Sequence, residues 1–172
     1  TSIEKEYFNG FSSLEYITIP SSVTSIGDDA FYGCSSIIKI SFPSSVTSIG
    51  KNCFRECSSL EEVILPTSIT SIEKNTFYGC SSLEKISIPK SVTKIGKNAF
   101  YECSLLSQIS IPSSIISIGK SAFMYCASLN EISISSSLNS IKDYSFLGCS
   151  SLKKVLISIP SSIVSIGNHS FL

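Results

Sequence analysis

The chain contains no tryptophan, a single methionine and few charged side chains, which make up 15% of its 172 residues. Thirteen basic residues balance thirteen acidic ones, so the formal net charge is zero and no overall field attracts nucleic acid or an anionic membrane. The sequence also lacks an apolar run of about 18 residues, the length that a membrane-spanning helix needs. We therefore expect no nucleic-acid partner and no direct insertion into a membrane.

Histidine is nearly absent as well, and this argues against a catalytic or metal site. His169 is the only histidine, and no motif pairs it with a nucleophile. The neighbouring carboxylates Glu61 and Glu62 would point to opposite faces of a strand, so they would not converge as a glycosidase pair does. A metal site requires converging ligands, and none are recognisable. We expect no catalytic residue, no cofactor and no metal, and therefore no enzyme activity.

The sequence does contain a 23-residue repeat, which phenylalanine, cysteine and proline all follow. The phenylalanines of the repeat are Phe8, Phe31, Phe54, Phe77, Phe100, Phe123 and Phe146, and its cysteines are Cys34, Cys57, Cys80, Cys103, Cys126 and Cys149. Pro160 comes two residues later than the period requires, which indicates a two-residue insertion near Leu156–Ile157. About seven units with partial ends fill residues 1–172, so we expect one solenoid domain.

Each unit contains two strand patterns followed by a turn. In the first full unit, residues 14–19 alternate apolar and polar side chains, as a half-buried strand does, and Pro20 fits the end of that strand. Residues 23–26 include β-branched side chains and indicate a second short strand, and Gly27 suggests a tight corner. Asp29 is an N-cap residue type, so we expect a single short turn after it, of 3₁₀ type.

A single unit is too small to fold alone, because the apolar side chains that it buries do not offset the entropy lost in ordering 23 residues. Stacked units share a core and add hydrogen bonds between coils about 4.8 Å apart. The side chains expected to point inward in the first full unit are Leu14, Ile17, Ile19, Val23, Ile26, Ala30, Phe31 and Cys34. The repeat therefore predicts a stack in which equivalent residues lie in file.

The segment from Ile17 to Gly27, together with Ala30, Phe31 and Cys34, resembles the BspA type of leucine-rich repeat, and the resemblance covers nearly the whole chain. It implies a mostly β solenoid: a right-handed coil with a parallel sheet on one face and short 3₁₀ turns on the other. It also implies a cell-surface or secreted protein that binds host matrix proteins or other cells, without shared catalytic residues. The residues that depart from the family pattern are Glu73 and Lys142 at the glycine position, Ser135 at the proline position and Phe11 at the cysteine position.

Two functions remain open. The resemblance implies non-catalytic recognition of a protein, or of a glycan, in adhesion at a cell surface. Unpaired thiols and the absence of a signal-peptide pattern in residues 1–6 favour instead an intracellular, cytoplasmic scaffold that binds a protein partner. Neither end of the chain looks like a solenoid cap, so we expect either a segment of a longer protein or self-association through the ends.

The outward face of the first strand column, called the strand face below, is the leading candidate for partner binding. It is polar, it is acidic in the middle, and Ile38 and Ile64 are expected as exposed apolar exceptions. The candidate residues are Glu15, Tyr16, Ile38, Lys39, Glu61, Glu62, Ile64, Glu84, Lys85, Gln108 and Glu131. The alternative is a face that only solvent covers.

Two further surfaces are secondary candidates. Four lysines at one repeat position, called the lysine stripe below, are Lys51, Lys74, Lys97 and Lys120. Like charges about 5 Å apart repel one another, so the stripe either holds an anion such as a sulfated glycan or is solvated and resists lateral aggregation. Tyrosines on the turn side, called the tyrosine row below, either contact a partner or cover the phenylalanines; they are Tyr32, Tyr78, Tyr101 and Tyr125.

The cysteines are expected to be buried free thiols. Adjacent coils bring successive cysteines within the Cα range of a disulfide, but their side chains should point inward in parallel, which is poor geometry for a bridge. Free cysteine behaves as a small, usually buried hydrophobic residue. Cys53 lies at the alanine position, where small size is what matters.

Overall fold

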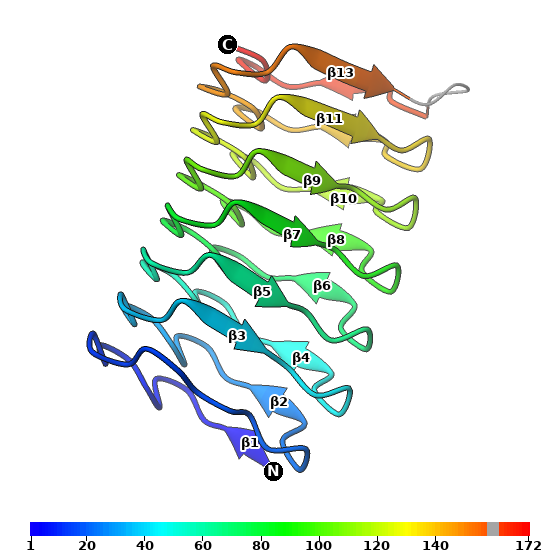
Figure 1. Cartoon of the computed structure of the whole chain (residues 1–172). Helices are drawn as coiled ribbons and strands as arrows, with labels where there is room; N and C mark the ends of the chain where they lie inside the picture. The colour runs from blue at the N-terminus through cyan, green and yellow to red at the C-terminus, as the bar shows by residue number, and fades with distance from the viewer. Residues whose placement is uncertain (158–161) are drawn as a thin grey trace.

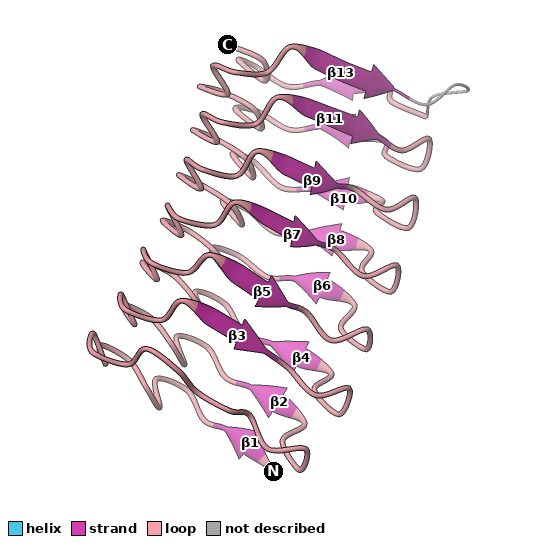
Figure 2. Ribbon diagram, viewed as in Figure 1, coloured by secondary structure: helices cyan, strands magenta, loops and turns pink. Residues whose placement is uncertain are grey.

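The computed structural model describes residues 1–157 and 162–172, which form one stack of coils with a strand column on each side (Figure 1). Every strand pairs in parallel with the equivalent strand of a neighbouring coil, and the described residues contain no helix (Figure 2). None of them therefore forms a helix long and apolar enough to cross a membrane. The predicted mostly β solenoid of about seven turns is confirmed.

The first strand column contributes the strand face. Its strands are β3 (Lys39–Ser41), β5 (Glu62–Ile64), β7 (Lys85–Ser87), β9 (Gln108–Ser110), β11 (Glu131–Ile134) and β13 (Lys154–Ile157). Their central residues point inward and their flanking residues outward, as in the exposed–buried–exposed pattern of β7. Residues 14–19 were expected to form the first strand of this column, but no strand is assigned to them.

The second strand column has two-residue strands on the opposite side of the core. They are β1 (Ser2–Ile3), β2 (Ser25–Ile26), β4 (Ser48–Ile49), β6 (Ser71–Ile72), β8 (Lys94–Ile95), β10 (Ser117–Ile118), β12 (Ser140–Ile141) and β14 (Ser165–Ile166). Serine side chains stabilise the contact between coils on this side. The hydroxyl groups of Ser45 and Ser114 donate hydrogen bonds of 2.7 Å to the carbonyl oxygens of Val23 and Val92 in the preceding coil. Hydrogen bonding between coils is therefore one role of the repeated serines.

The phenylalanines form the continuous file that the repeat predicts. Each ring from Phe8 to Phe171 stacks on the next, with centroids 5.1 to 5.5 Å apart and planes within 12° of parallel. Backbone bonds accompany the stacking, since Phe31 N donates to Cys53 O at 2.9 Å and Phe54 N donates to Thr76 O at 2.8 Å. The offset stacking and the hydrogen bonds hold consecutive coils in one register.

The turn geometry differs from the prediction. Asp29, Asn52, Asn75 and Asn98 have φ between 54° and 57°, so they adopt the left-handed conformation, whereas an N-cap residue is extended. Asn75 Nδ2 donates to Asn52 Oδ1 at 2.8 Å, and Asn98 Nδ2 donates to Asn75 Oδ1 at 3.1 Å. A single turn does follow Asp29, with Tyr32 N donating to Asp29 O at 3.1 Å in the i to i+3 pattern of a 3₁₀ turn, but no 3₁₀ helix is assigned there, because left-handed residues interrupt any helix.

Glycine at the corner allows coils to approach closely. A Cβ atom on Gly119 would lie 2.5 Å from the backbone nitrogen of Lys97, and one on Gly96 would lie 2.6 Å from that of Lys74. Contacts this short do not accommodate a side chain without displacing the backbone. The corner residue of each of these coils therefore packs directly on the backbone of the coil before it.

The two-residue insertion lies slightly later than expected. Ile134 still pairs with Ile157 at the 23-residue spacing, whereas Ser140 pairs with Ser165 at a spacing of 25. The extra residues therefore fall between Ile157 and Ser165. Pro160, on which the prediction rested, lies outside the described residues.

All seven cysteines are buried and free, as predicted. Six of them donate to the phenylalanine carbonyl of the preceding coil, for example Cys57 Sγ to Phe31 O at 3.0 Å and Cys103 Sγ to Phe77 O at 3.2 Å. Burial raises the pKa of the Cys34 thiol to about 11 and that of Cys149 to about 12. The thiolate is the reactive form, so these thiols are poor nucleophiles in the folded protein.

We predict that replacing Ile86 by Asp destabilises the stack. Ile86 is buried in β7 in the middle of the stack, where a carboxylate finds no partner, so the change should cost several kcal/mol. Thermal unfolding followed by circular dichroism should show a lower midpoint or two separate transitions. Ile116→Asp is the matched control, because Ile116 is exposed. Equal melting curves for the wild type and Ile86→Asp would contradict the inward assignment.

We also predict that the thiols react only after unfolding. A thiol reagent should find all seven cysteines in denaturant without reductant and almost none in the native protein; three or fewer in denaturant would contradict free thiols.

The buried thiols should also make the stability of the fold depend on pH. The pKa values of the thiols in the folded chain exceed the value of about 8.5 in the unfolded chain, so the thiols contribute to the free energy of unfolding below about pH 8.5. This contribution should be lost progressively as the pH rises towards 11 to 12, which melting curves across this range would detect.

Candidate functional site

The strand face contains a hollow of about 830 Å³ across β5, β7, β9 and β11. The predicted residues that line it are Glu62, Ile64, Lys85, Gln108 and Glu131. Its floor includes the buried Ile86 and Ile109, and Ile64 contributes the largest exposed apolar surface, with 48% of the residue accessible. The structure thus brings five of the eleven predicted residues to one concave site.

The other predicted residues of the strand face lie outside the hollow. They are Glu15, Tyr16, Ile38, Lys39, Glu61 and Glu84. Tyr16 is 68% exposed, but Ile38 is only partly exposed and not the open apolar site that was expected. The hollow is also lined by Thr67 and Pro89, which follow β5 and β7 and were not predicted. Their repeat positions carried no signal of this role, because the hollow depends on how successive coils are arranged.

Charges on this face pair across neighbouring coils. Lys39 Nζ lies 2.7 Å from Glu62 Oε2, and Lys154 Nζ lies 3.3 Å from Glu131 Oε2. Both pairs are about half exposed, so each contributes little to stability, on the order of 0–1 kcal/mol. Lys85 lies between them on the central strand β7 with no carboxylate within 4.0 Å among the residues described. The central strand of the face therefore places a cation that has no ion pair among the described residues beside an exposed isoleucine.

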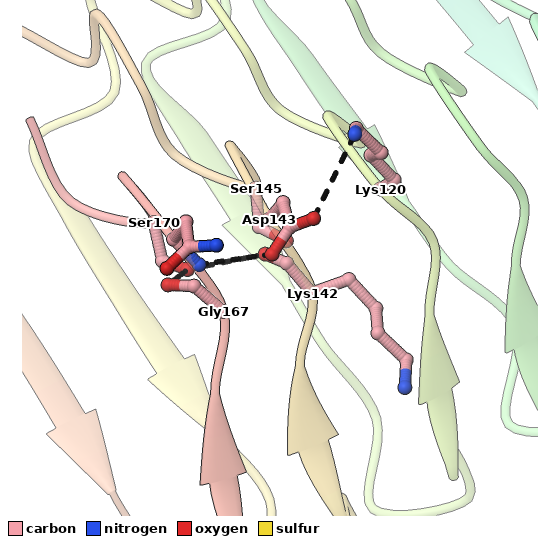
Figure 3. Close-up of polar contacts among 7 residues, drawn as sticks. Lys120, Lys142, Asp143, Ser145, Gly167 and Ser170 are labelled. Carbon is pink, nitrogen blue, oxygen red and sulfur yellow. Dashed lines mark hydrogen bonds and ion pairs between the residues drawn. The ribbon is translucent and has the colours of Figure 1, made fainter.

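The lysine stripe runs along the corner between the turns and the second strand column, and its four side chains are exposed. Asp28 and Asp143 occupy the same repeat position at its two ends. Asp143 Oδ2 lies 3.6 Å from Lys120 Nζ, while Asp143 Oδ1 accepts a hydrogen bond from Asn168 N at 2.9 Å (Figure 3). At about 5 Å in water, each pair of neighbouring lysines repels by roughly 0.8 kcal/mol.

The tyrosine row includes an arginine that sequence analysis missed. Arg55 shares the repeat position of Tyr32 and Tyr78, and its guanidinium carbon lies 5.7 Å and 4.6 Å from their ring centroids. Its Nε atom is buried without a hydrogen bond and lies 3.6 Å from Glu56 Oε1. Because Arg55 occupies the same repeat position as Tyr32 and Tyr78, the repeat period could have predicted that it belongs to this row.

The row continues through the remaining tyrosines. Tyr78 stacks on Tyr101 with centroids 4.5 Å apart, and Tyr125 meets Tyr101 edge-on at 5.6 Å. Desolvation, followed by the nearby Glu102 carboxylate, raises the pKa of Tyr101. Tyr78 and Tyr101 therefore cover one ring face of each other, whereas Tyr125 remains 42% exposed.

The one histidine of the chain lies in the last coil, against a tyrosine of the coil before it. The His169 ring stacks on Tyr144 with centroids 5.5 Å apart. Within residues 1–157 and 162–172, no three histidine, cysteine or acidic side chains lie close enough to hold a metal ion.

Comparisons with known proteins agree with the repeat. The model of the family "BspA type Leucine rich repeat region" matches in six copies, over residues 1–106 and 70–172. No curated protein matches the chain. A leucine-rich repeat protein from T. pallidum is 32% identical, with a TM-score of 0.80, over 87% of this chain and 71% of that one.

Two other solved structures are similar over smaller parts of their own length. A leucine-rich repeat protein from Bacteroides ovatus is 27% identical with a TM-score of 0.71, over 99% of this chain and 55% of that one. The pneumococcal vaccine antigen PcpA has the same fold at 23% identity, with a TM-score of 0.66, over 86% of this chain and 40% of that one. Such repeats form scaffolds that generally recognise proteins and are generally non-catalytic. The stacked 23-residue coils and the matching family model show that the chain belongs to the BspA-type leucine-rich repeat family.

Proposed function

We propose that this chain is a non-catalytic recognition domain whose strand face binds a protein ligand in adhesion at a cell surface or in a secreted protein. The hollow across β5 to β11 carries this proposal, because it is concave and partly apolar, and is bordered by charged side chains. A site of this kind binds through a small buried apolar centre and uses the surrounding polar groups for orientation. Surface location is supported by the family and by the fold shared with a pneumococcal antigen.

Ile64 would be the anchor of this interaction. It lies at the end of β5, it is 48% exposed, and burial of an exposed isoleucine by a partner is favourable by about 1–2 kcal/mol. Lys85 on the neighbouring strand would pair with a carboxylate of the partner, since no carboxylate of the described chain is within ion-pair distance. The ligand that fits best is therefore a protein surface with an apolar side chain next to an acidic one.

The cytoplasmic scaffold stays as the second candidate, and the seven free thiols are the observation that favours it. The free thiols support a cytoplasmic location only in part, because six of them are hydrogen-bonded in the core and burial raises the pKa of thiols such as Cys34 and Cys149. Buried thiols of this kind resist oxidation outside the cell too. Adding a protease to intact cells and probing for the repeat separates the two: loss of the signal supports a surface protein, and protection supports the scaffold.

We predict that Ile64→Glu weakens binding of the chain to its protein ligand by at least about tenfold, the cost of losing an apolar anchor. Purified matrix proteins such as laminin, collagen and fibronectin serve as immobilised probes, and binding of the folded chain is measured by surface plasmon resonance. Ile116→Glu is the matched control, because Ile116 is an exposed isoleucine on the opposite strand column. If both variants lose binding equally, or neither does, the strand face is not the site.

A further inference from the structure

We propose that the lysine stripe is a binding site for a linear sulfated polysaccharide, on a surface separate from the strand face. The proposal concerns a second ligand class and does not depend on the hollow.

The backbone holds the lysines in file. The carbonyl oxygens of Lys51 and Lys74 accept hydrogen bonds from Asp29 N at 2.8 Å and Asn52 N at 3.0 Å. Lys97 and Lys120 repeat this pattern with the next two coils, at 3.0 and 3.1 Å. Because parallel coils lie about 4.8 Å apart, the four lysines span about 14 Å along one straight edge. A rigid row of this kind suits a linear ligand better than a compact one.

The corner glycines keep the row regular. Gly96 packs on the backbone of Lys74 and Gly119 on that of Lys97, so the residues that precede Lys97 and Lys120 add no side chain between coils. Gly50 likewise packs on the backbone of Asp28. Glu73 is the exception within the stripe, and Ser71 Oγ donates to its carboxylate at 2.7 Å. The acid beside Lys74 is thereby held by its own strand, and no ion pair joins it to a lysine among the described residues.

The inner positive charges have no internal partner. Over the described part of the chain, no carboxylate oxygen lies within 4.0 Å of the ammonium groups of Lys51, Lys74 or Lys97. Acids occur instead at the two ends of the row, where Asp28 accepts from the Lys51 backbone at 2.7 Å and Asp143 lies near the Lys120 ammonium group (Figure 3). Lys94, exposed on β8, adds a further cation three residues before Lys97. The site is therefore a bounded cationic line.

The surroundings favour a sulfated polysaccharide over a nucleic acid. Proteins that bind single-stranded nucleic acid stack its bases on aromatic side chains. Among the described residues, the one aromatic ring in contact with a lysine of the stripe is that of Tyr144, whose centroid lies 4.9 Å from Lys120 Nζ at the end of the row. The neighbouring second strand column presents serine at Ser48 and Ser117, whose hydroxyl groups suit sugar hydroxyls. Lysine acts as a point charge, which a sulfate group can meet without bidentate geometry.

The test is binding of a fluorescein-labelled heparin octasaccharide to the whole chain, measured by fluorescence anisotropy from 50 to 300 mM NaCl. Lys74→Gln with Lys97→Gln should weaken binding at least about tenfold and lower the slope of log affinity against log salt by about 2, one per lost lysine. Lys153→Gln with Lys154→Gln removes the same charge from the strand face and should change affinity less than about twofold. Glu73→Gly, which restores the corner glycine, should tighten binding.

Three results would overturn the proposal. The first is no binding of heparin at 50 mM NaCl by a wild-type chain whose melting curve shows that it is folded. The second is an equal loss in the two lysine double variants, which would mean that overall charge acts and not the stripe. The third is tighter binding of a single-stranded DNA of the same charge, which would assign the stripe to nucleic acid. Ile64→Glu should leave heparin binding unchanged, so failure here is separable from failure of the strand-face proposal.

Discussion

The repeat length of one coil is the constraint on which the rest of this structure depends. Each phenylalanine ring can stack on the next, at 5.1 to 5.5 Å, only if every circuit returns the chain to the same point one coil further along. The strand pairs, the thiol–carbonyl bonds and the asparagine ladder use the same spacing. Where two residues are added, after Ile157, the second strand column still pairs, because the additional length is taken up before Ser165.

Because of this constraint, residues at one repeat position lie next to one another along the stack. A residue type that recurs at one position therefore forms a straight row that repeats the same chemical group from coil to coil. Buried rows provide stability: phenylalanine fills the core, and cysteine fills a small space while its thiol satisfies a carbonyl oxygen. Exposed rows provide recognition chemistry, and a departure from the pattern, such as Ile64 among serines or Arg55 between tyrosines, marks a place where that chemistry changes.

Although the net charge is zero, positive and negative side chains are distributed unequally among the rows. The lysine stripe occupies one corner, whereas the strand face combines acids with lysines that pair with them across coils, as Lys39 does with Glu62. A domain with this distribution does not attract polyanions as a whole, but it can present a cationic edge to one ligand and a mixed hollow to another. Two independent ligands on one small solenoid are therefore physically compatible.

The sequence alone determined the period, the identity of the inward side chains and the burial of the cysteines, because all three follow from which residue types recur at 23-residue intervals. It also identified the strand face and the lysine stripe as rows. Only the tertiary structure decided the turn geometry, since asparagine tolerates both the extended and the left-handed backbone and its choice depends on a partner one coil away. The same holds for the hollow beside Ile64 and for the guanidinium of Arg55 between two rings, because both depend on the arrangement of consecutive coils in space, which no single repeat unit contains.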